Sequence, residues 1–265
     1  MRKLNVAVLG ANGFIGNYLA DNLKGFNVIR VTRNTVDLTN SEQTKKFFDD
    51  NTIHCVVNCA IHSNSTMDKF LPEVAMDNMS IFSNLYSNRH KFSKLINFGS
   101  GAEFDRRFSI DSAEESEIFN VSPIDHYGMS KNICSRISFH TENFYTLRAF
   151  GVFFSGEPEK RLLRKVISNS LIELSDKYFD YFSLDDILKV VQLYVSQNVP
   201  LKDVNLVYPK KILLSEFVQT FCEIKGLKTN FKIHSDSLNY TGSSKNIDKL
   251  NLEFTPLEKS FERYK

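Results

Sequence analysis

The chain has 265 residues with 33 basic and 31 acidic side chains, so its formal net charge is +2. An apolar share of 42% excludes a disordered chain, and the balanced charge argues against a dedicated nucleic-acid binder. Its apolar runs are too short to span a bilayer, and its four cysteines form no CxxC pair, so we expect a cytoplasmic globular protein without a membrane partner.

The first 150 residues alternate short apolar runs with longer amphipathic segments. This alternation predicts a doubly wound α/β fold with a parallel sheet buried on both faces. The predicted strands cover residues 4–9, 27–31, 53–58, 95–98 and 144–150. The predicted helices cover residues 13–24, 41–50, 73–88 and 126–142.

The pattern is less regular after residue 150, where we expect a smaller substrate-binding lobe over 151–265. Helices are predicted over 160–170, over 183–196 with Ser183 as N-cap, over 215–225 ended by Gly226, and at the terminus over 244–250. Strands are predicted over 178–182, 203–207 and 230–234. Elements near 183–207 are expected to return to the first sheet, so that 1–150 with these additions forms a Rossmann domain binding NAD(P).

A glycine-rich turn follows the first predicted strand and opens the first helix. Three of the chain's 11 glycines, Gly10, Gly13 and Gly16, fall within seven residues. Such a strand–turn–helix lets backbone N–H groups and a helix N-terminus meet a pyrophosphate. The alternative is a turn without a ligand. We predict that the cofactor cradle consists of Gly10, Asn12, Gly13, Phe14, Ile15 and Gly16.

The spacing GxxGxxG resembles the short-chain dehydrogenase/reductase superfamily, specifically its extended branch that modifies sugar nucleotides. Proteins of this kind that use NAD usually carry an acid at the end of the second strand, where residues 30–34 here contain two arginines and no acid. Arg33 can pair with a 2′-phosphate, so NADP(H) is favoured over NAD(H). The alternative for Arg33 is a solvated side chain at a strand end.

The resemblance implies further contacts along the cofactor. Asp37 and Leu38 would edge the adenine ring, and Cys59, Ala60 and Ile61 would lie beside the ribose. The resemblance also implies that the cofactor contacts Asn78, Phe98, Phe150 and Val152. The alternative for Asn78 is an ordinary packing role.

A second strong motif is Tyr127 followed four residues later by Lys131, which puts both on one helix face. A lysine ammonium near a tyrosine stabilises the phenolate and lowers the pKa of that tyrosine. Ser100 ends an apolar strand 27 residues earlier, where the family places a Ser or Thr that binds the reacting oxygen. Ser100, Tyr127 and Lys131 are therefore the predicted catalytic residues, and Tyr127 and Lys131 also contact the cofactor.

Departures from the family narrow the predicted reaction. Dehydratases of this family carry an acid pair where this chain has Gly101 and Ala102, and epimerase–reductases carry a cysteine where it has Ala102. Neither residue can transfer a proton. The prediction is reduction of the C4 keto group of a nucleotide-activated 4-keto-6-deoxy sugar, a hexose or heptose, during deoxysugar synthesis for surface polysaccharide.

The substrate contacts are harder to predict. Candidates are His62, Ala102, Glu103, His126, Gly151 and Arg161, and Lys160 or Arg164 are further candidates for the substrate diphosphate, with solvated helix cations as the alternative. No cluster has metal-ligand spacing, so no metal is expected. Two other readings stay open: a UDP-sugar 4-epimerase with tightly bound NAD, and a regulator that senses NADP(H) without turnover. The resemblance also implies a homodimer through the helices over 73–88 and 126–142.

Overall fold

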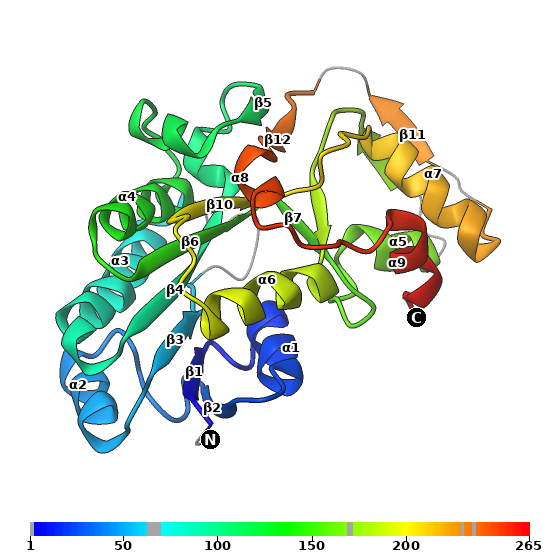
Figure 1. Ribbon diagram of the computed structural model, residues 1–265. Helices are drawn as coiled ribbons and strands as arrows, with labels where there is room; N and C mark the ends of the chain where they lie inside the picture. Colours follow the sequence, from blue (N-terminus) through cyan, green and yellow to red (C-terminus); the bar gives the residue numbers. More distant parts are fainter. Residues whose placement is uncertain (1–2, 63–69, 169–171, 229–230, 235–236) are drawn as a thin grey trace.

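The computed structural model describes residues 3–62, 70–168, 172–228, 231–234 and 237–265. Its centre is a parallel sheet in the order β10-β6-β4-β3-β1-β2 (Figure 1). The strands are β1 (Asn5–Leu9), β2 (Asn27–Val31), β3 (Cys55–Asn58), β4 (Lys94–Ser100), β6 (Phe144–Ala149) and β10 (Asp203–Leu206). The predicted α/β fold is confirmed. The strand order reverses between β1 and β3, and ligands of open α/β sheets bind at such a switch point.

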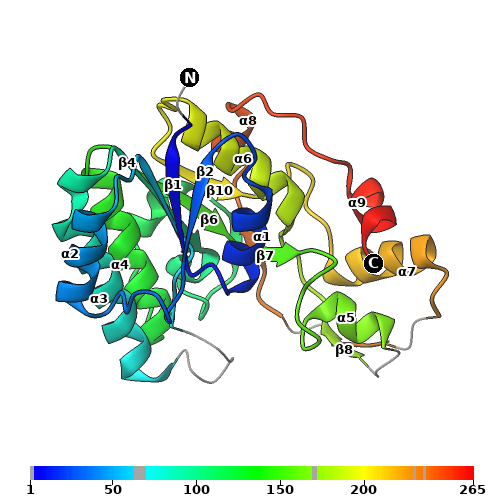
Figure 2. The same ribbon diagram turned by 90° about the horizontal axis from the view of Figure 1, so that it is seen from below.

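Helices cover both faces of this sheet (Figures 1 and 2). One face packs against α1 (Phe14–Asn22) and α6 (Leu184–Ser196), and the other against α2 (Ser41–Asp50), α3 (Pro72–Ser87) and α4 (His126–His140). Alternate residues of β1 supply both cores, because Val6 and Val8 face the first set of helices while Ala7 and Leu9 face the second. This double burial explains why the strands are continuous apolar runs.

A smaller lobe lies beside the carboxyl ends of the strands. Its own core is rich in phenylalanine and includes Phe153, Phe217, Phe221 and Phe261. The lobe contains β7 (Gly151–Phe153), α5 (Leu162–Ile167), β8 (Ile172–Ser175), β9 (Tyr181–Ser183), α7 (Leu214–Lys225), β11 (Phe231–His234) and α9 (Leu257–Arg263). β7 pairs with β9, and β8 pairs with β11, both in parallel.

The two parts of the chain are interleaved rather than divided at residue 150. β10 pairs with β6 in the central sheet, and α6 contacts α1. α8 (Lys245–Asp248) contacts β10. β12 (Tyr240–Gly242) pairs with β5 (Ile110–Ala113), a strand that follows β4 in the chain and lies outside the central sheet. The carboxyl-terminal segment therefore returns to β5 and β10 before it ends in α9 (Figure 1).

Most predicted elements are present with shifted ends, because local patterns fix an element better than its boundaries. Ser183 caps α6 by accepting from the Asp186 N–H at 3.1 Å, and Gly226 ends α7 with φ of 63°. The prediction of 244–250 as the terminal helix was wrong, because α9 follows it. The strands β5, β7, β8 and β12 were missed because three or four residues carry too little periodicity. Residues 169, 170 and 230 of two predicted elements lie outside the described residues.

The short 3₁₀ helices η2 (Arg89–Lys91), η3 (Gly101–Phe104) and η4 (Glu115–Phe119) complete the fold. In the described part of the chain, no helix combines the length and the apolar character needed to cross a bilayer.

Candidate active site

The turn between β1 and α1 is shaped by its glycines. Gly10 has φ of +71°, and a Cβ there would lie 2.8 Å from the backbone of Ala60 at the end of β3. The Gly10 carbonyl accepts from the Gly13 N–H at 2.8 Å, and Gly13 precedes α1 without a side-chain cap. The first N–H groups of α1 are therefore not capped by a side chain, and a pyrophosphate can approach the turn closely.

This turn forms the floor of a cleft of about 620 Å³ at the switch point between β1 and β3. Twelve of the predicted cofactor residues line it: Gly10, Asn12, Gly13, Phe14, Ile15, Gly16, Arg33, Asp37, Leu38, Cys59, Ala60 and Ile61. Burial raises the pKa of the Cys59 thiol to about 12, against the opposing charge of Lys131, so this residue presents a neutral thiol at pH 7.

The two arginines at the end of β2 differ in their surroundings. Arg30 is bound to Asp21 at 2.6 Å, to the Asn17 side chain at 2.6 Å and to the Ala11 carbonyl at 3.0 Å. Arg33 lines the cleft and is exposed. Asp37 accepts from the Thr39 hydroxyl at 2.7 Å, and this hydrogen bond holds the pKa of its carboxyl below the usual range. Arg33 is thus the cation available to a phosphate at this end of the cleft.

The three predicted catalytic residues come from two neighbouring elements. Ser100 ends β4, and Tyr127 and Lys131 lie on the first turns of α4, whose N-cap Asp125 accepts from the Gly128 N–H at 2.8 Å. A Cβ at Gly128 would lie 2.6 Å from the Ala102 carbonyl, so α4 packs closely against the segment that follows Ser100. Lys131 is buried and its Nζ donates to the Phe98 carbonyl at 2.7 Å.

Two predicted residues, His62 and Asn78, connect the segment directly after β3 with α3. The Asn78 side chain accepts from the His62 N–H at 2.8 Å, and His62 Nδ1 lies 2.6 Å from Asp77 Oδ2. Asn78 is itself buried, so its position favours holding His62 over contacting a ligand. Asn58, at the end of β3, supports the same edge by accepting from the Ala60 N–H at 3.2 Å.

Several predicted ligand contacts are buried instead. Ala102 and Glu103 have no exposed surface, and Gly151 packs against Phe179 and Asp180. The Glu103 carboxylate accepts from the Ser100 N–H at 2.7 Å and binds Arg148 Nε at 2.7 Å, so the structure does not support it as a substrate contact. The side chains of Phe98, Phe150 and Val152 are also buried, and none of the three lines the cleft. His126, beside Tyr127, is half-buried.

Arg161 reaches a different site from the predicted one. With Pro158 and Lys160 it lines the cleft above the glycine turn, its guanidinium 5.2 Å from the centre of the Phe14 ring. It also donates to the Val152 carbonyl and binds Glu157 at 3.2 Å. The structure thus puts Arg161 and Lys160 at the cofactor end, whereas Arg164 is bound to Glu159 at 2.5 Å.

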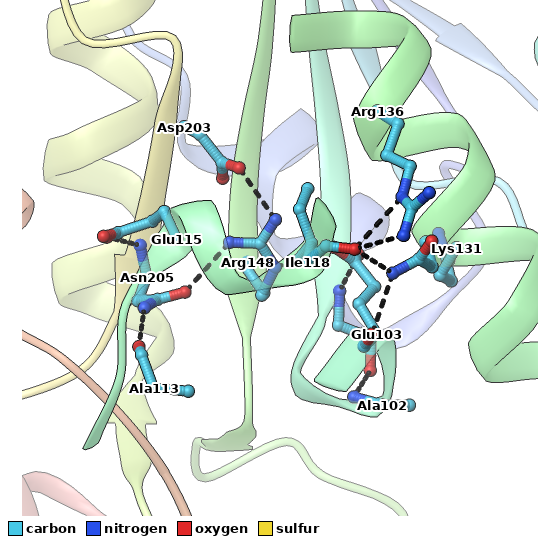
Figure 3. Close-up of polar contacts among 12 residues, drawn as sticks. Ala102, Glu103, Ala113, Glu115, Ile118, Lys131, Arg136, Arg148, Asp203 and Asn205 are labelled. Carbon is cyan, nitrogen blue, oxygen red and sulfur yellow. Dashed lines mark hydrogen bonds and ion pairs between the residues drawn. The ribbon is translucent and has the colours of Figure 1, made fainter. Parts of the chain in front are cut away.

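A buried charge network connects Glu103, three residues after Ser100, with β6 and β10 (Figure 3). Arg148 is completely buried on β6 and binds Glu103 at 2.7 Å, Asp203 at 2.9 Å and the Asn205 side chain at 3.0 Å. Burial opposes the charge of Arg148, but the two carboxylates outweigh this effect and raise its pKa. Burial raises the pKa of Asp203 to about 7, even though Arg148 opposes that shift.

Two residues beside the candidate site were missed from the sequence. Arg106 binds Asp125, the N-cap of α4, at 2.7 Å. The Tyr240 ring lies against the residue that follows Ser100, since a Cβ at Gly101 would be 2.8 Å from Tyr240 Cζ. Neither residue belongs to a short motif, and Tyr240 comes 140 residues after Ser100, so only the fold brings it there. Among the residues that the structure describes, no group of three His, Cys, Asp or Glu side chains is arranged to hold a metal.

Comparisons with known proteins agree with this geometry. Residues 6–177 match the NAD dependent epimerase/dehydratase family. A GDP-mannoheptose C4 reductase from Campylobacter jejuni with NADP bound shares the fold with a TM-score of 0.82 at 17% identity, over 99% of this chain and 97% of that chain. A dTDP-4-dehydrorhamnose reductase from Bacillus anthracis in complex with NADP has a TM-score of 0.82 at 16% identity, over 100% and 98% of the two chains.

A UDP-glucose 4-epimerase from Thermotoga maritima with UDP-glucose is similar to nearly the same degree, with a TM-score of 0.80 at 16% identity over 98% and 97% of the chains. At such identities the likeness establishes the fold. No curated protein sequence matches this chain significantly.

Proposed function

The chain belongs to the NAD-dependent epimerase/dehydratase family, and on that premise we propose that it reduces the C4 keto group of a nucleotide-activated 4-keto-6-deoxy sugar with NADPH. The sugar would be a hexose or heptose destined for surface polysaccharide. One observation carries the proposal. After Ser100, the segment offers Gly101, Ala102 and a completely buried Glu103, none of which can move a substrate proton. Tyr127 and Ser100 are then left to act on a carbonyl, as a simple reduction requires.

The cleft fits NADP(H). The glycine turn and the N-terminus of α1 suit a pyrophosphate, because a Cβ at Gly10 would meet the Ala60 backbone and narrow the approach. Arg33 suits a 2′-phosphate, since a guanidinium pairs with phosphate through two parallel hydrogen bonds. Lys160 and Arg161 line the same cleft and add positive charge near the pyrophosphate. The two reductases of similar fold are described with NADP bound, which agrees with this choice.

The protein's own groups would act at the carbonyl oxygen. Bound NADPH supplies the hydride. Tyr127 donates its phenolic proton to the oxygen as negative charge develops there, and Ser100 donates a hydrogen bond to the same oxygen. Lys131 would orient the cofactor ribose from the same face of α4 as Tyr127. The charge of Lys131 also lowers the pKa of the Cys59 thiol, against the effect of burial, and Cys59 lines the cleft. Lys131, on α4, is therefore close to the wall of the cofactor cleft.

A 4-epimerase with retained NAD is the second candidate. It is favoured by the fold of the Thermotoga maritima enzyme, which resembles this chain about as well as the reductases do. Epimerisation uses the same Ser–Tyr–Lys set, so those residues do not separate the two reactions. Arg33 in the cleft and the lack of an acid in residues 30–34 favour NADP(H) over a retained NAD, and therefore favour the reductase.

The test is consumption of NADPH, followed by its absorbance, with a panel of nucleotide 4-keto-6-deoxy sugars. The reductase predicts consumption with one of them and a loss of about 10²- to 10⁴-fold in Tyr127→Phe. The epimerase predicts NAD retained through purification and interconversion of UDP-sugars without net consumption. NADPH binding without turnover on any sugar would favour the sensor.

We also propose a homodimer formed through α3 and α4. These helices pack side by side and expose Met76, Met79, Ile137 and Phe139. Apolar side chains on neighbouring helices are suited to bury against a second copy.

A further inference from the structure

Residues 154–161, which connect β7 with α5, bring the smaller lobe to the cofactor cleft. At one end of this segment the ring of Phe154 packs edge-on against Tyr18 of α1, with the centroids 4.4 Å apart. At the other end Lys160 and Arg161 line the same cleft as the glycine turn. The smaller lobe therefore contributes part of the wall of a cleft whose floor belongs to the first domain.

Arg161 is held over the first turn of α1. Its guanidinium carbon lies 5.2 Å from the centre of the Phe14 ring, and Phe14 directly follows Gly13. Its Nε donates to Glu157 at 3.2 Å, and its Nη2 donates to the Val152 carbonyl. A guanidinium has five N–H donors, and no acceptor within the described residues takes a hydrogen from Nη1. That group can therefore bind a ligand in the cleft.

Glu157 is fixed from the side of the smaller lobe. Its side chain is only 2% exposed, and its Oε1 accepts from the Tyr264 hydroxyl at 2.8 Å while its Oε2 accepts from Arg161. Tyr264 is itself buried in the core of the smaller lobe, where its ring lies 5.2 Å from the centroid of Phe221. The core of the smaller lobe thus determines, through one carboxylate, where the guanidinium of Arg161 lies.

A second pair of an acid and an arginine in the same stretch of chain has no such surroundings. Arg164 binds Glu159 at 2.5 Å, but the Glu159 side chain is 74% exposed and Arg164 does not line the cleft. Exposed ion pairs of this kind are screened by water and contribute little to stability. The two pairs therefore provide matched variants, one facing the cofactor cleft and one facing solvent.

We propose that Arg161 binds the pyrophosphate of the cofactor from the smaller lobe, and that Glu157 is the positioning residue that holds it over the glycine turn. A guanidinium pairs with phosphate oxygens through parallel hydrogen bonds and also lies favourably over an aromatic ring, as Arg161 does over Phe14. The cofactor would then be bound by backbone N–H groups of the first domain and by a side chain of the smaller lobe. This inference rests on the proposed NADP(H) site and adds two residues to it.

Fluorescence titration with NADPH and with NADH tests the arginine. Arg161→Met should raise the dissociation constants of both nucleotides about ten- to hundredfold, because both contain the pyrophosphate and hydrogen bonds to charged groups are strong. This equal loss distinguishes Arg161 from Arg33, whose replacement should affect NADPH far more. The control Arg164→Met should stay within about twofold of the unaltered protein. An unchanged dissociation constant for NADPH in Arg161→Met would overturn the proposal.

A second comparison tests the positioning role of Glu157. Glu157→Gln keeps the shape of the side chain and removes its charge, and it should raise the dissociation constant for NADPH about three- to tenfold. In an Arg161→Met background the same change should have almost no further effect, because Glu157 acts through Arg161. The control Glu159→Gln should leave NADPH binding unchanged.

The opposite outcomes of this comparison are distinct. An equal loss in both backgrounds would overturn the positioning role, since Glu157 would then act independently of Arg161. Tighter NADPH binding in Glu157→Gln would also overturn it, since Glu157 would then compete with the cofactor for the guanidinium. Failure of the unaltered protein to bind either nucleotide would instead refute the proposed reductase function, so the two failures can be told apart.

Discussion

Replacing Arg148 by methionine tests whether the buried charge network stabilises the catalytic side of the fold. Arg148 binds Glu103 at 2.7 Å and Asp203 at 2.9 Å, and all three side chains are at most 5% exposed. Removing one partner of a buried ion pair costs about 3–5 kcal/mol, because an uncompensated charge remains. Since domains are typically stable by about 5–15 kcal/mol, Arg148→Met should fold with a much lower free energy of unfolding.

The measurement is urea unfolding at pH 5 and at pH 8. The pKa of Asp203 is about 7 in the fold, above the value of about 4 in the unfolded chain, so its contribution to stability falls as pH rises from about 4 to 7. Without Arg148 this pKa rises further. The destabilisation by Arg148→Met should therefore be larger at pH 8, where the Asp203 carboxyl is driven to ionise, than at pH 5.

A combined variant is the matched control. Glu103→Gln and Asp203→Asn added to Arg148→Met remove the charges together, and should recover most of the lost stability. A loss below about 1 kcal/mol at pH 8, or an equal loss at both pH values, would refute the account of the network as a compensated charge cluster.

The other predictions concern the cofactor cleft and the dimer. Arg33→Asp should weaken NADPH binding about ten- to hundredfold and NADH binding far less, as measured by fluorescence titration; equal losses would remove the 2′-phosphate assignment. Gly10→Ala should weaken NADPH binding and lower the thermal midpoint more than Gly25→Ala, because both glycines have positive φ but only Gly10 has backbone within 4 Å of its Cβ position. Met76→Asp should shift the protein to monomer in light scattering, whereas an unchanged mass would place the interface elsewhere or exclude the dimer.

The sequence by itself identified the parts of this protein that depend on neighbouring residues. The apolar strands, the glycine turn at Gly10, the Ser183 cap and the pair Tyr127 and Lys131 are all local patterns, because helix periodicity, positive φ and capping involve residues within a few positions. These patterns were enough to predict the α/β fold and the family, which the strand order and the match over residues 6–177 confirm.

Only the tertiary structure decided where individual side chains point around this framework. Glu103 turns inward because Arg148, 45 residues away, needs a buried counter-charge. Arg161 faces the cofactor cleft because the segment that precedes α5 brings its guanidinium over the ring of Phe14. The Tyr240 ring reaches Gly101, directly after Ser100, because β12 pairs with β5 across 130 residues of chain. Such contacts depend on how helices and strands that are distant in the sequence pack against one another. The local periodicity of the sequence therefore does not predict them.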